Sequence, residues 1–312
     1  MTGYLVTGVA GFIGSNLAEG ILARGHRVVG VDNFLTGKRE NIAAFQDRME
    51  FHEGDIRDLP LMRKLCDGVD FVLHHAALAS VPWSVDDPVL AHDHNVTGTL
   101  NVLVAARDAG VKKVVAAVTS AAYGDTEIMP CRENQPTESL SPYAATKLMD
   151  EIYAALFSRI YGLPTVGLRY FNVFGKRQDP QSAYAAAIPV FVHKALRNEQ
   201  PVIFGDGEQT RDFVYIEDVI EANLKACEAG PEADGQVFNI GTGKSVTINA
   251  LCNRIIELLG VDLAPTLGPV RQGDVLHSLA DIEKARRILG FSPKFDVMTG
   301  LEKSIDWYRE NL

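Results

Sequence analysis

Short apolar runs alternate with helix-period segments over the first half of this chain, and this alternation restricts its fold more than any other feature. Apolar runs that suit buried strands cover residues 4–8, 26–32, 49–55, 69–76, 112–120 and 164–174. Helices are expected between and after them, over 12–24, 58–66, 86–109, 142–162, 185–198 and 217–229, several of which end at a glycine. Strands that alternate with helices form parallel sheets covered on both faces. The sequence therefore predicts an α/β fold with a doubly wound parallel sheet.

The regular alternation ends near residue 172, where loops rich in glycine and proline and short strands around VIFGDG begin. Further helices are expected near 247–259, 281–289 and 297–311. The segment FVYIEDVIEANLKACE reads as a strand and a helix that return to the first domain. We therefore expect a nucleotide-binding domain of residues 1–172 plus about 212–240. A smaller C-terminal α/β substrate-binding domain would contain about 173–211 plus 241–312.

The charge of the chain argues against two classes of partner. With 30 Lys and Arg against 40 Asp and Glu, the net charge is -10, which disfavours binding to nucleic acid or to an anionic membrane. No window approaches the apolar length of a membrane span, and Met1 leads straight into YLVTG without a basic leader. The four cysteines lie far apart without a CxxC pair. These features predict a cytoplasmic protein.

A glycine-rich turn follows the first strand and opens the first helix. It reads TGVAGFIG, with Gly8 in the tight turn, Gly11 where a pyrophosphate approaches the backbone, and Gly14 where helix and strand pack closely. Asp32 ends the second strand 18 residues after Gly14. A carboxylate there accepts from both ribose hydroxyls of NAD and repels the 2'-phosphate of NADP. The pattern predicts NAD binding by this turn, which also includes Phe12 and Ile13.

Residues that follow the third and fourth strands are expected to extend this site. Asp55 and Ile56 are placed to meet the adenine, and His75, Ala76 and Ala77 would lie beneath the cofactor. An equally good interpretation makes His75 and its neighbour His74 packed strand residues.

Two histidines nearby do not form a metal site. His92 and His94 are two residues apart, so they would point to different faces of a helix, and we expect both at the surface. The sequence predicts no metal.

The strongest chemical signal is a YxxxK pattern. Tyr143 and Lys147 lie four apart, after the helix-start signal of Ser141 and Pro142, so both side chains share one helical face. A nearby cation favours phenolate, which would lower the pKa of a tyrosine from about 10 toward working pH and make it a general base. A hydroxyl pair, Thr119 and Ser120, ends the fifth strand, where Thr119 would hydrogen-bond the hydroxyl that is oxidised.

A series of motifs extends over essentially the whole chain in a familiar order. It reads TGVAGFIG, VDNF, GDIRD, HHAALASVP, TSAAYGD, SPYAATK, RYFNVFG, GDGEQTRDFVYIEDV, NIGTG and RQGDVLHSLAD. In these motifs the chain resembles the extended short-chain dehydrogenase/reductases that act on nucleotide sugars, which have a Rossmann fold. The stretches LASVP, GKRQDPQSAYAAAIP and VLHSLAD are most similar to the UDP-N-acetylglucosamine 4-epimerases within that family.

The resemblance implies a role for each motif residue. Tyr143 would be the base, Lys147 would hold the nicotinamide ribose, and Thr119 with Ser120 would orient the sugar. Further cofactor contacts are implied for Asn33, Asn95 and Tyr170. Substrate contacts are implied for Ser80, Asn172, Ala185, Arg211, Arg271, Asp274 and Ser278.

Among the implied substrate contacts, the two arginines would pair with the diphosphate, which supplies the local positive charge that an acidic protein needs. Asp274 would lie near the uridine ribose, and the 185–189 stretch would contact the UDP. The small Ser278 would leave room for an N-acetyl group beside C2'.

One departure separates the chain from related sugar 4,6-dehydratases, which carry an Asp-Glu pair after the corresponding threonine. Here Ser120, Ala121 and Ala122 follow, so no acid is available to protonate a leaving hydroxyl. Many of the epimerases carry a third hydroxyl residue where this chain has Ala121.

We therefore expect a UDP-N-acetylglucosamine 4-epimerase with tightly held NAD, with UDP-glucose and UDP-galactose as further substrates. The alternatives are a UDP-uronic acid 4-epimerase or decarboxylase on the same scaffold, and a catalytically silent NAD-binding regulator. In relatives the helices that correspond to 86–109 and 142–162 pair across a twofold axis, which implies a homodimer.

Overall fold

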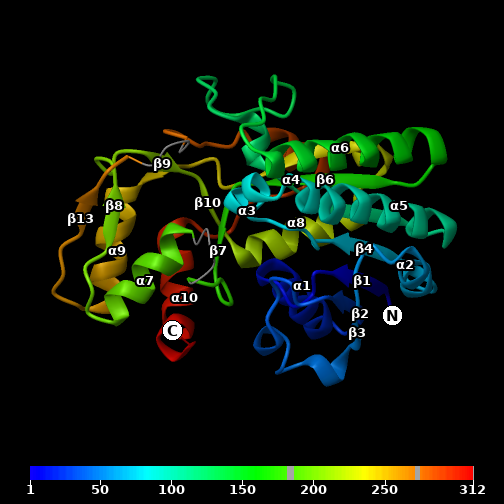
Figure 1. The fold of residues 1–312 in the computed structure, drawn as a ribbon, viewed down its shortest axis with the longest axis horizontal. Coiled ribbons are helices and arrows are strands. Elements are labelled where there is room, and N and C mark those ends of the chain that lie inside the picture. The colour runs from blue at the N-terminus through cyan, green and yellow to red at the C-terminus, as the bar shows by residue number, and fades with distance from the viewer. Residues whose placement is uncertain (181–185, 271–274, 312) are drawn as a thin grey trace.

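The computed structural model describes residues 1–180, 186–270 and 275–311. A seven-stranded sheet lies at its centre, in the order β11-β6-β5-β4-β1-β2-β3, and every neighbouring pair is parallel. The strands are β1 (Gly3–Thr7), β2 (Arg27–Asp32), β3 (Glu50–Glu53), β4 (Phe71–His74), β5 (Lys113–Thr119), β6 (Thr165–Tyr170) and β11 (Gln236–Ile240). The predicted doubly wound parallel sheet is confirmed (Figure 1).

Helices cover both faces of the sheet. α1 (Phe12–Ala23) and α8 (Ile216–Glu228) pack together on one face, and α2 (Leu59–Cys66), α5 (Gly98–Asp108) and α6 (Pro142–Tyr161) form a layer on the other (Figure 1). Side chains of β1 pack alternately into the hydrophobic cores on the two faces of the sheet: Tyr4 and Val6 belong to one core, and Leu5 belongs to the other. A strand buried on both faces is why the apolar runs in the sequence are continuous.

The strand of the returning segment is not where the sequence predicts it. β10 (Phe213–Tyr215) pairs with β7 (Asn172–Phe174) in a separate two-stranded ladder, and the seventh strand of the main sheet is β11 instead. The predicted strand 164–174 is also interrupted, because Phe171 still donates to the Ile240 carbonyl of β11 at 3.0 Å whereas the next N–H, of Asn172, donates to the Asp212 carbonyl beside β10 at 3.0 Å. The return of the helix, α8, agrees with the prediction.

The helix predicted over 86–109 begins at Pro88 in the structure, and a separate short helix precedes it. α3 (Val81–Asp86) ends before α4 (Pro88–His92) begins, since the Asp87 side chain caps the new helix by accepting from the Leu90 N–H at 2.9 Å. Pro88 cannot continue a preceding helix but fits a first turn. α4 then continues into α5 through a π-helical turn at Asp93–Thr97.

The remaining helices and strands lie together in the C-terminal part of the chain. α7 (Ala187–Leu196), α9 (Ile248–Leu259) and α10 (Val297–Asn311) pack against one another beside two short ladders (Figure 1). The ladders pair β8 (Val202–Phe204) with β13 (Thr266–Gly268), and β9 (Thr210–Arg211) with β12 (Val246–Thr247). Single turns of helix occur at Arg39–Asn41, Gln46–Arg48, Ser120–Tyr123, Pro231–Ala233 and Ala285–Leu289. Within the described ranges, no helix is both long and apolar enough to cross a bilayer. The domain boundaries stay a prediction.

Candidate active site

The glycine turn is built so closely that two of its positions admit no side chain. Gly8 has a φ of +70°, and a Cβ there would lie 2.7 Å from the backbone nitrogen of Ala76. A Cβ on Gly14 would lie 2.0 Å from the Gly8 carbonyl oxygen. The backbone therefore passes directly over the end of β4, and α1 begins against it. This leaves the N-terminal N–H groups of α1 facing an open cleft, which is the arrangement that suits a diphosphate.

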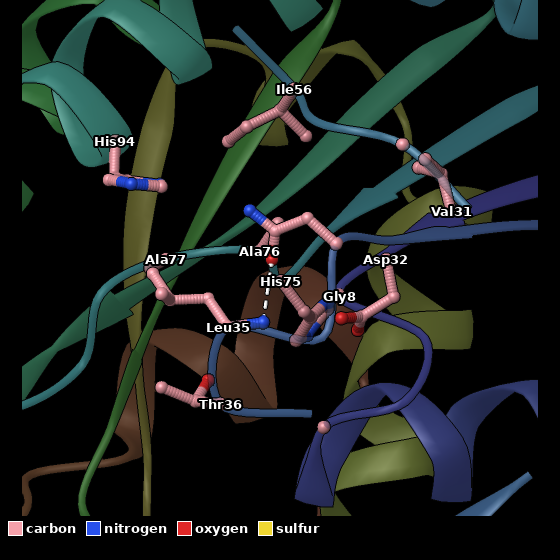
Figure 2. A pocket seen from close by; sticks show the side chains of 13 residues that line it. Gly8, Val31, Asp32, Leu35, Thr36, Ile56, His75, Ala76, Ala77 and His94 are labelled. Atoms are coloured by element: carbon pink, nitrogen blue, oxygen red, sulfur yellow. Dashed lines mark hydrogen bonds between the residues drawn. The ribbon is translucent and has the colours of Figure 1, made fainter. Parts of the chain in front are cut away.

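Asp32, at the end of β2, lies beside this turn in a pocket of its own (Figure 2). Its two carboxylate oxygens accept one backbone N–H each, from Ala10 at 2.9 Å and from Phe34 at 2.8 Å. Burial raises the pKa of Asp32, and these hydrogen bonds oppose the rise. A carboxylate offers about four acceptor positions, so Asp32 can also accept from ribose hydroxyls.

The Asp32 pocket gathers several of the predicted cofactor residues. It is lined by Gly8, Gly11, Val31, Asp32, Asn33, Leu35, Thr36, Gly54, Ile56, His75, Ala76, Ala77 and His94. Asp55 stays at its edge, where its carboxylate accepts from Asn33 Nδ2 at 2.8 Å and from Arg57. Although burial acts the other way, the hydrogen bonds from Arg57 hold the pKa of Asp55 well below its usual range.

His94 corrects the expectation that both helix histidines lie at the surface. It is 6% exposed and faces the Asp32 pocket, while His92 is exposed as predicted (Figure 2). Burial lowers the pKa of His94, so the ring is a neutral aromatic wall. The π-helical turn changes the register of the helix at this point. Helical periodicity in the sequence gives no sign of such a turn.

A second cleft, the Tyr143 cleft, begins where α6 starts. Ser141 caps α6 by accepting from the Ala144 N–H at 3.2 Å, and the helix places Tyr143 and Lys147 on one face. The cleft is lined by Gly8, Gly11, Phe12, Ile13, Gly14, Thr36, His75, Ala77, Ala79, Ala117, Val118, Thr119, Tyr143, Lys147, Tyr170, Phe171, Val173 and Gln178. The glycine turn and the YxxxK pair therefore share one cleft, as the sequence predicts.

The electrostatics of Tyr143 differ from the sequence expectation. Burial raises the pKa of its phenol, and the charge of Lys147 and a hydrogen bond with Thr119 only partly oppose the rise. The charge of Lys147 alone does not bring the pKa of Tyr143 down to working pH. The expectation was wrong because it counted the cation and not the loss of water around the ring. The positively charged nicotinamide ring of NAD would add a second cation when bound.

Lys147 has a partner that the sequence analysis missed. Its ammonium donates to Asp150 Oδ2 at 2.8 Å, and both side chains are buried. Burial lowers the pKa of Lys147, but the charge of Asp150 more than compensates and raises it overall. The spacing of three residues on a helix was the available signal.

Tyr170 and the two strand histidines are held by hydrogen bonds. His75 Nε2 lies 2.9 Å from the Tyr170 hydroxyl, which also accepts from Asn223 Nδ2 at 2.8 Å. Burial lowers the pKa of His75 to about 3 and raises that of Tyr170. His74 is fully packed within the strand, while His75 also faces both pockets described above.

A third cleft, the Ser278 cleft, meets the Tyr143 cleft at Thr119, Tyr170 and Phe171. It is lined by Val81, Thr119, Ser120, Ala121, Tyr123, Gly124, Thr126, Met129, Cys131, Leu140, Ser141, Tyr170, Phe171, Asn172, Arg211, Val275, His277 and Ser278. The structure thus brings together Thr119, Ser120, Asn172, Arg211 and Ser278, which are far apart in the sequence. A ligand in this cleft would reach the hydroxyl pair from the side opposite the glycine turn.

Other predicted residues lie elsewhere. Ser80 caps α3, with its hydroxyl accepting from the Trp83 N–H at 3.3 Å. Asn95 is buried, and its amide hydrogen-bonds Leu78 and the Thr146 hydroxyl. Neither Ser80 nor Asn95 is among the described residues that line the three clefts. The remaining predicted residues lie outside the described ranges, namely Ala185, Arg271 and Asp274.

Comparisons with known proteins decide the family. The model of the NAD dependent epimerase/dehydratase family matches residues 4–241. The chain belongs to this family.

Individual relatives of this epimerase/dehydratase match over nearly full length. A putative UDP-glucose 4-epimerase of Methanocaldococcus jannaschii is 40% identical over 98% of both chains. A UDP-glucose 4-epimerase of Thermotoga maritima, solved with UDP-glucose, is 39% identical with a TM-score of 0.93 and covers 99% of both chains. A UDP-N-acetylglucosamine 4-epimerase of Methanobrevibacter ruminantium M1, in complex with UDP-N-acetylmuramic acid, is 38% identical with a TM-score of 0.95 and covers 100% of this chain and 99% of its own.

NAD is the cofactor of this epimerase/dehydratase, in agreement with the sequence. The glycine turn, the Asp32 carboxylate in its pocket and the apolar walls of the two pockets fit a dinucleotide. Within the described ranges, no cluster of three or more His, Cys, Asp and Glu side chains is arranged to hold a metal ion.

The Ser278 cleft of this epimerase/dehydratase holds no carboxylate among its described lining residues. A sugar dehydration needs a group that protonates the departing hydroxyl. Tyr143 hydrogen-bonds Thr119 at the wall that the two clefts share, whereas the Tyr170 hydroxyl at that wall is held by His75 and Asn223. The described residues therefore supply a group for proton transfer at one hydroxyl and no carboxylic acid in the Ser278 cleft.

Proposed function

We propose that the protein is a UDP-N-acetylglucosamine 4-epimerase that interconverts UDP-GlcNAc and UDP-GalNAc, with UDP-glucose and UDP-galactose as further substrates. The observation that carries this proposal is the composition of the Ser278 cleft. It joins the Tyr143 cleft at a hydroxyl pair, contains a small serine in its wall and has no described carboxylate. Oxidation and reduction at one carbon need only the single base that Tyr143 supplies.

The chemistry follows from the position of Tyr143 beside Thr119. The Tyr143 phenolate accepts the O4' proton while Thr119 hydrogen-bonds the same hydroxyl. When held in the cleft of Gly11 and Lys147, NAD would supply hydride transfer at C4', as acceptor from the sugar and then as donor to the opposite face of the keto sugar. Tyr143 then gives its proton back to O4', so protein and cofactor end the cycle unchanged. Lys147 stabilises the phenolate through its charge.

The nucleotide part of the substrate must hold the complex while the sugar turns over. Asn172 and Arg211 line the Ser278 cleft and would contact the UDP there, with Arg211 at the diphosphate. Arg271, Asp274 and the 185–189 stretch would complete this contact. Residues 1–172 plus about 212–240 would bind NAD, and the rest of the chain would bind the UDP-sugar. Anchoring through UDP leaves the sugar free to present either face.

A panel of substrates tests this assignment. The purified protein would be assayed for kcat/KM with UDP-GlcNAc, UDP-GalNAc, UDP-glucose, UDP-galactose and UDP-glucuronic acid. We expect turnover of the acetylated pair, with the plain pair as further substrates. Turnover confined to the uronic acid would replace the proposal with the uronic alternative, and release of carbon dioxide would indicate a decarboxylase.

We also propose a homodimer formed through α4 and α6. These helices contact each other, and each carries an apolar side chain that is exposed, Val89 at 77% and Ile152 at 60%. Large apolar side chains that stand exposed on adjacent helices favour an interface. Light scattering would give a mass of twice 34.0 kDa if the pair forms and 34.0 kDa if it does not.

A further inference from the structure

The buried ion pair beneath Tyr143 is not explained by sugar or cofactor binding. Asp150 is fully enclosed, and its Oδ2 accepts from Lys147 at 2.8 Å. Isolated buried charges are costly, and such a pair persists where both partners are further hydrogen-bonded. Asp150 therefore needs donors besides Lys147.

A chain of side chains begins at the end of β1 and runs toward Asp150. The Thr7 hydroxyl oxygen accepts from the backbone N–H groups of His75 and Ala76, both at 3.1 Å. Its own hydrogen is therefore directed to His74 Nδ1, 2.8 Å away. His74 must then carry its proton on Nε2, which lies 2.9 Å from the Thr99 hydroxyl. Burial lowers the pKa of His74 well below its usual value, which keeps this ring neutral.

Thr99 accepts from His74, so its own hydrogen is free to point at Asp150. Burial raises the pKa of Asp150, whereas Lys147 and a hydrogen bond from Thr99 lower it. The hydrogen bonds thus run from Thr7 through His74 to Thr99. Among the described residues Asp150 Oδ1 has no hydrogen-bond partner, and the Lys147 ammonium 2.8 Å from Oδ2 favours a carboxylate over a carboxylic acid.

We propose that Asp150 is a positioning residue of the active site, which fixes the ammonium of Lys147 beneath Tyr143 and sets the charge of the Tyr143–Lys147 pair. One N–H of the ammonium is committed to Asp150, and the other two remain for the cofactor cleft. The inference rests on the proposed role of Tyr143 as the base. It is distinct from substrate choice, since Asp150 lines none of the three clefts among their described residues.

The charges around Tyr143 and Lys147 determine in which direction their pKa values shift when the charge of Asp150 is removed. Asp150 raises the pKa of both Tyr143 and Lys147. The next carboxylate, Glu151, is paired with Arg169 through two contacts of 2.7 and 2.6 Å, and His74 is neutral. Removing the charge of Asp150 therefore lowers both pKa values together. Both limbs of the dependence of kcat on pH should then move to lower pH.

Asp150→Asn tests this, because it keeps the shape and one acceptor but removes the charge. We expect both limbs of the kcat profile to move to lower pH by about one unit or more, as for other opposite-charge contacts. A second readout needs neither substrate nor NAD. The near-ultraviolet phenolate absorbance of Tyr143, obtained by subtracting the same titration in the Tyr143→Phe background, should also appear at lower pH in the variant.

Asp218→Asn is the matched control. Asp218 is another buried carboxylate, which lies on α8 and accepts from the backbone N–H groups of Lys294 and Phe295. This variant should lose stability without moving either profile. If Asp150→Asn lowers activity and leaves both profiles in place, its role is structural and the inference is wrong.

Thr99→Val decides the matter if Asp150→Asn does not fold. It removes the hydroxyl and keeps the shape, so Asp150 holds less negative charge and the profiles should move the same way by a smaller amount. An unmoved phenolate titration overturns the inference. A wrong substrate assignment would leave the phenolate result unaffected, so the two proposals fail separately.

Discussion

The backbone N–H of Ser278 donates to the carbonyl of Thr210 at 3.1 Å, which fixes the serine beside the strand that carries Arg211. Arg211 Nη1 in turn donates to the Thr210 carbonyl at 2.9 Å. The wall of the Ser278 cleft and the proposed diphosphate contact therefore both hydrogen-bond the same carbonyl. The backbone at position 278 is fixed by this bond to β9.

Ser278→Tyr should select against acetylated sugars. A tyrosine at position 278 would overpack the space beside C2', which is expected to cost acetylated substrates roughly 1 to 3 kcal/mol or more of binding free energy. This cost corresponds to about 5- to 150-fold in kcat/KM. UDP-glucose and UDP-galactose lack the acetamido group and should be spared. The measurement is the ratio of kcat/KM for UDP-GlcNAc to that for UDP-glucose in both proteins.

Ser278→Ala is the matched control, because it keeps the wall small and should leave this ratio unchanged. An equal ratio in Ser278→Tyr and the native protein would show that Ser278 does not line the C2' side, and would reopen the choice of substrate.

Tyr143→Phe should retain the fold and bound NAD and lose most turnover. The substitution deletes the proton acceptor and preserves the ring, and a general acid-base group contributes roughly 10²- to 10⁴-fold. The measurements are kcat of the folded protein and, separately, the amount of NAD that is released when the protein is unfolded. A near-native rate would mean that another residue is the base.

The parts of the site that are set by backbone geometry could be predicted from the sequence. Gly8 and Gly14 admit no Cβ, and the YxxxK spacing fixes one helical face, so both leave a clear pattern. The position of His94 could not be predicted, because it depends on a π-helical turn. Nor could β11, whose five residues include the buried polar Asn239, which breaks the apolar run of a buried strand.

Effects of burial also escape sequence patterns. The pKa of Tyr143 is raised where the pattern predicts a lower one, since the pattern shows the cation and not the removal of water. Asp150 was missed for a related reason. A helix carboxylate three residues from a lysine is usually exposed, and only packing shows that both groups are buried.

Asp32→Ala should weaken NAD binding more than UDP-sugar binding. The variant removes the acceptor for the ribose hydroxyls and leaves the Ser278 cleft untouched. Separate titrations of the cofactor-free protein with NAD and of the loaded protein with UDP would measure both affinities. Glu53→Ala is the control, since Glu53 is an exposed acid paired with Arg39. Equal losses of both affinities in Asp32→Ala contradict the ribose assignment.

Ile152→Glu should weaken the proposed dimer, because it places a charge at the centre of the exposed apolar surface of α6. In light scattering over a dilution series, the variant should dissociate to the monomer at a higher protein concentration than the native protein does. Leu267→Glu, an equally exposed apolar position on β13, should leave the mass unchanged. A native protein that is already monomeric would exclude the dimer.

The most direct test of the central claim is the conversion of UDP-GlcNAc by the purified protein without added NAD. NAD that remains bound and is regenerated in each cycle should support many turnovers, and the reaction should end at the same UDP-GlcNAc to UDP-GalNAc ratio from either side. Failure to convert any UDP-sugar by a folded, NAD-loaded protein would contradict the account and support a catalytically silent NAD-binding regulator.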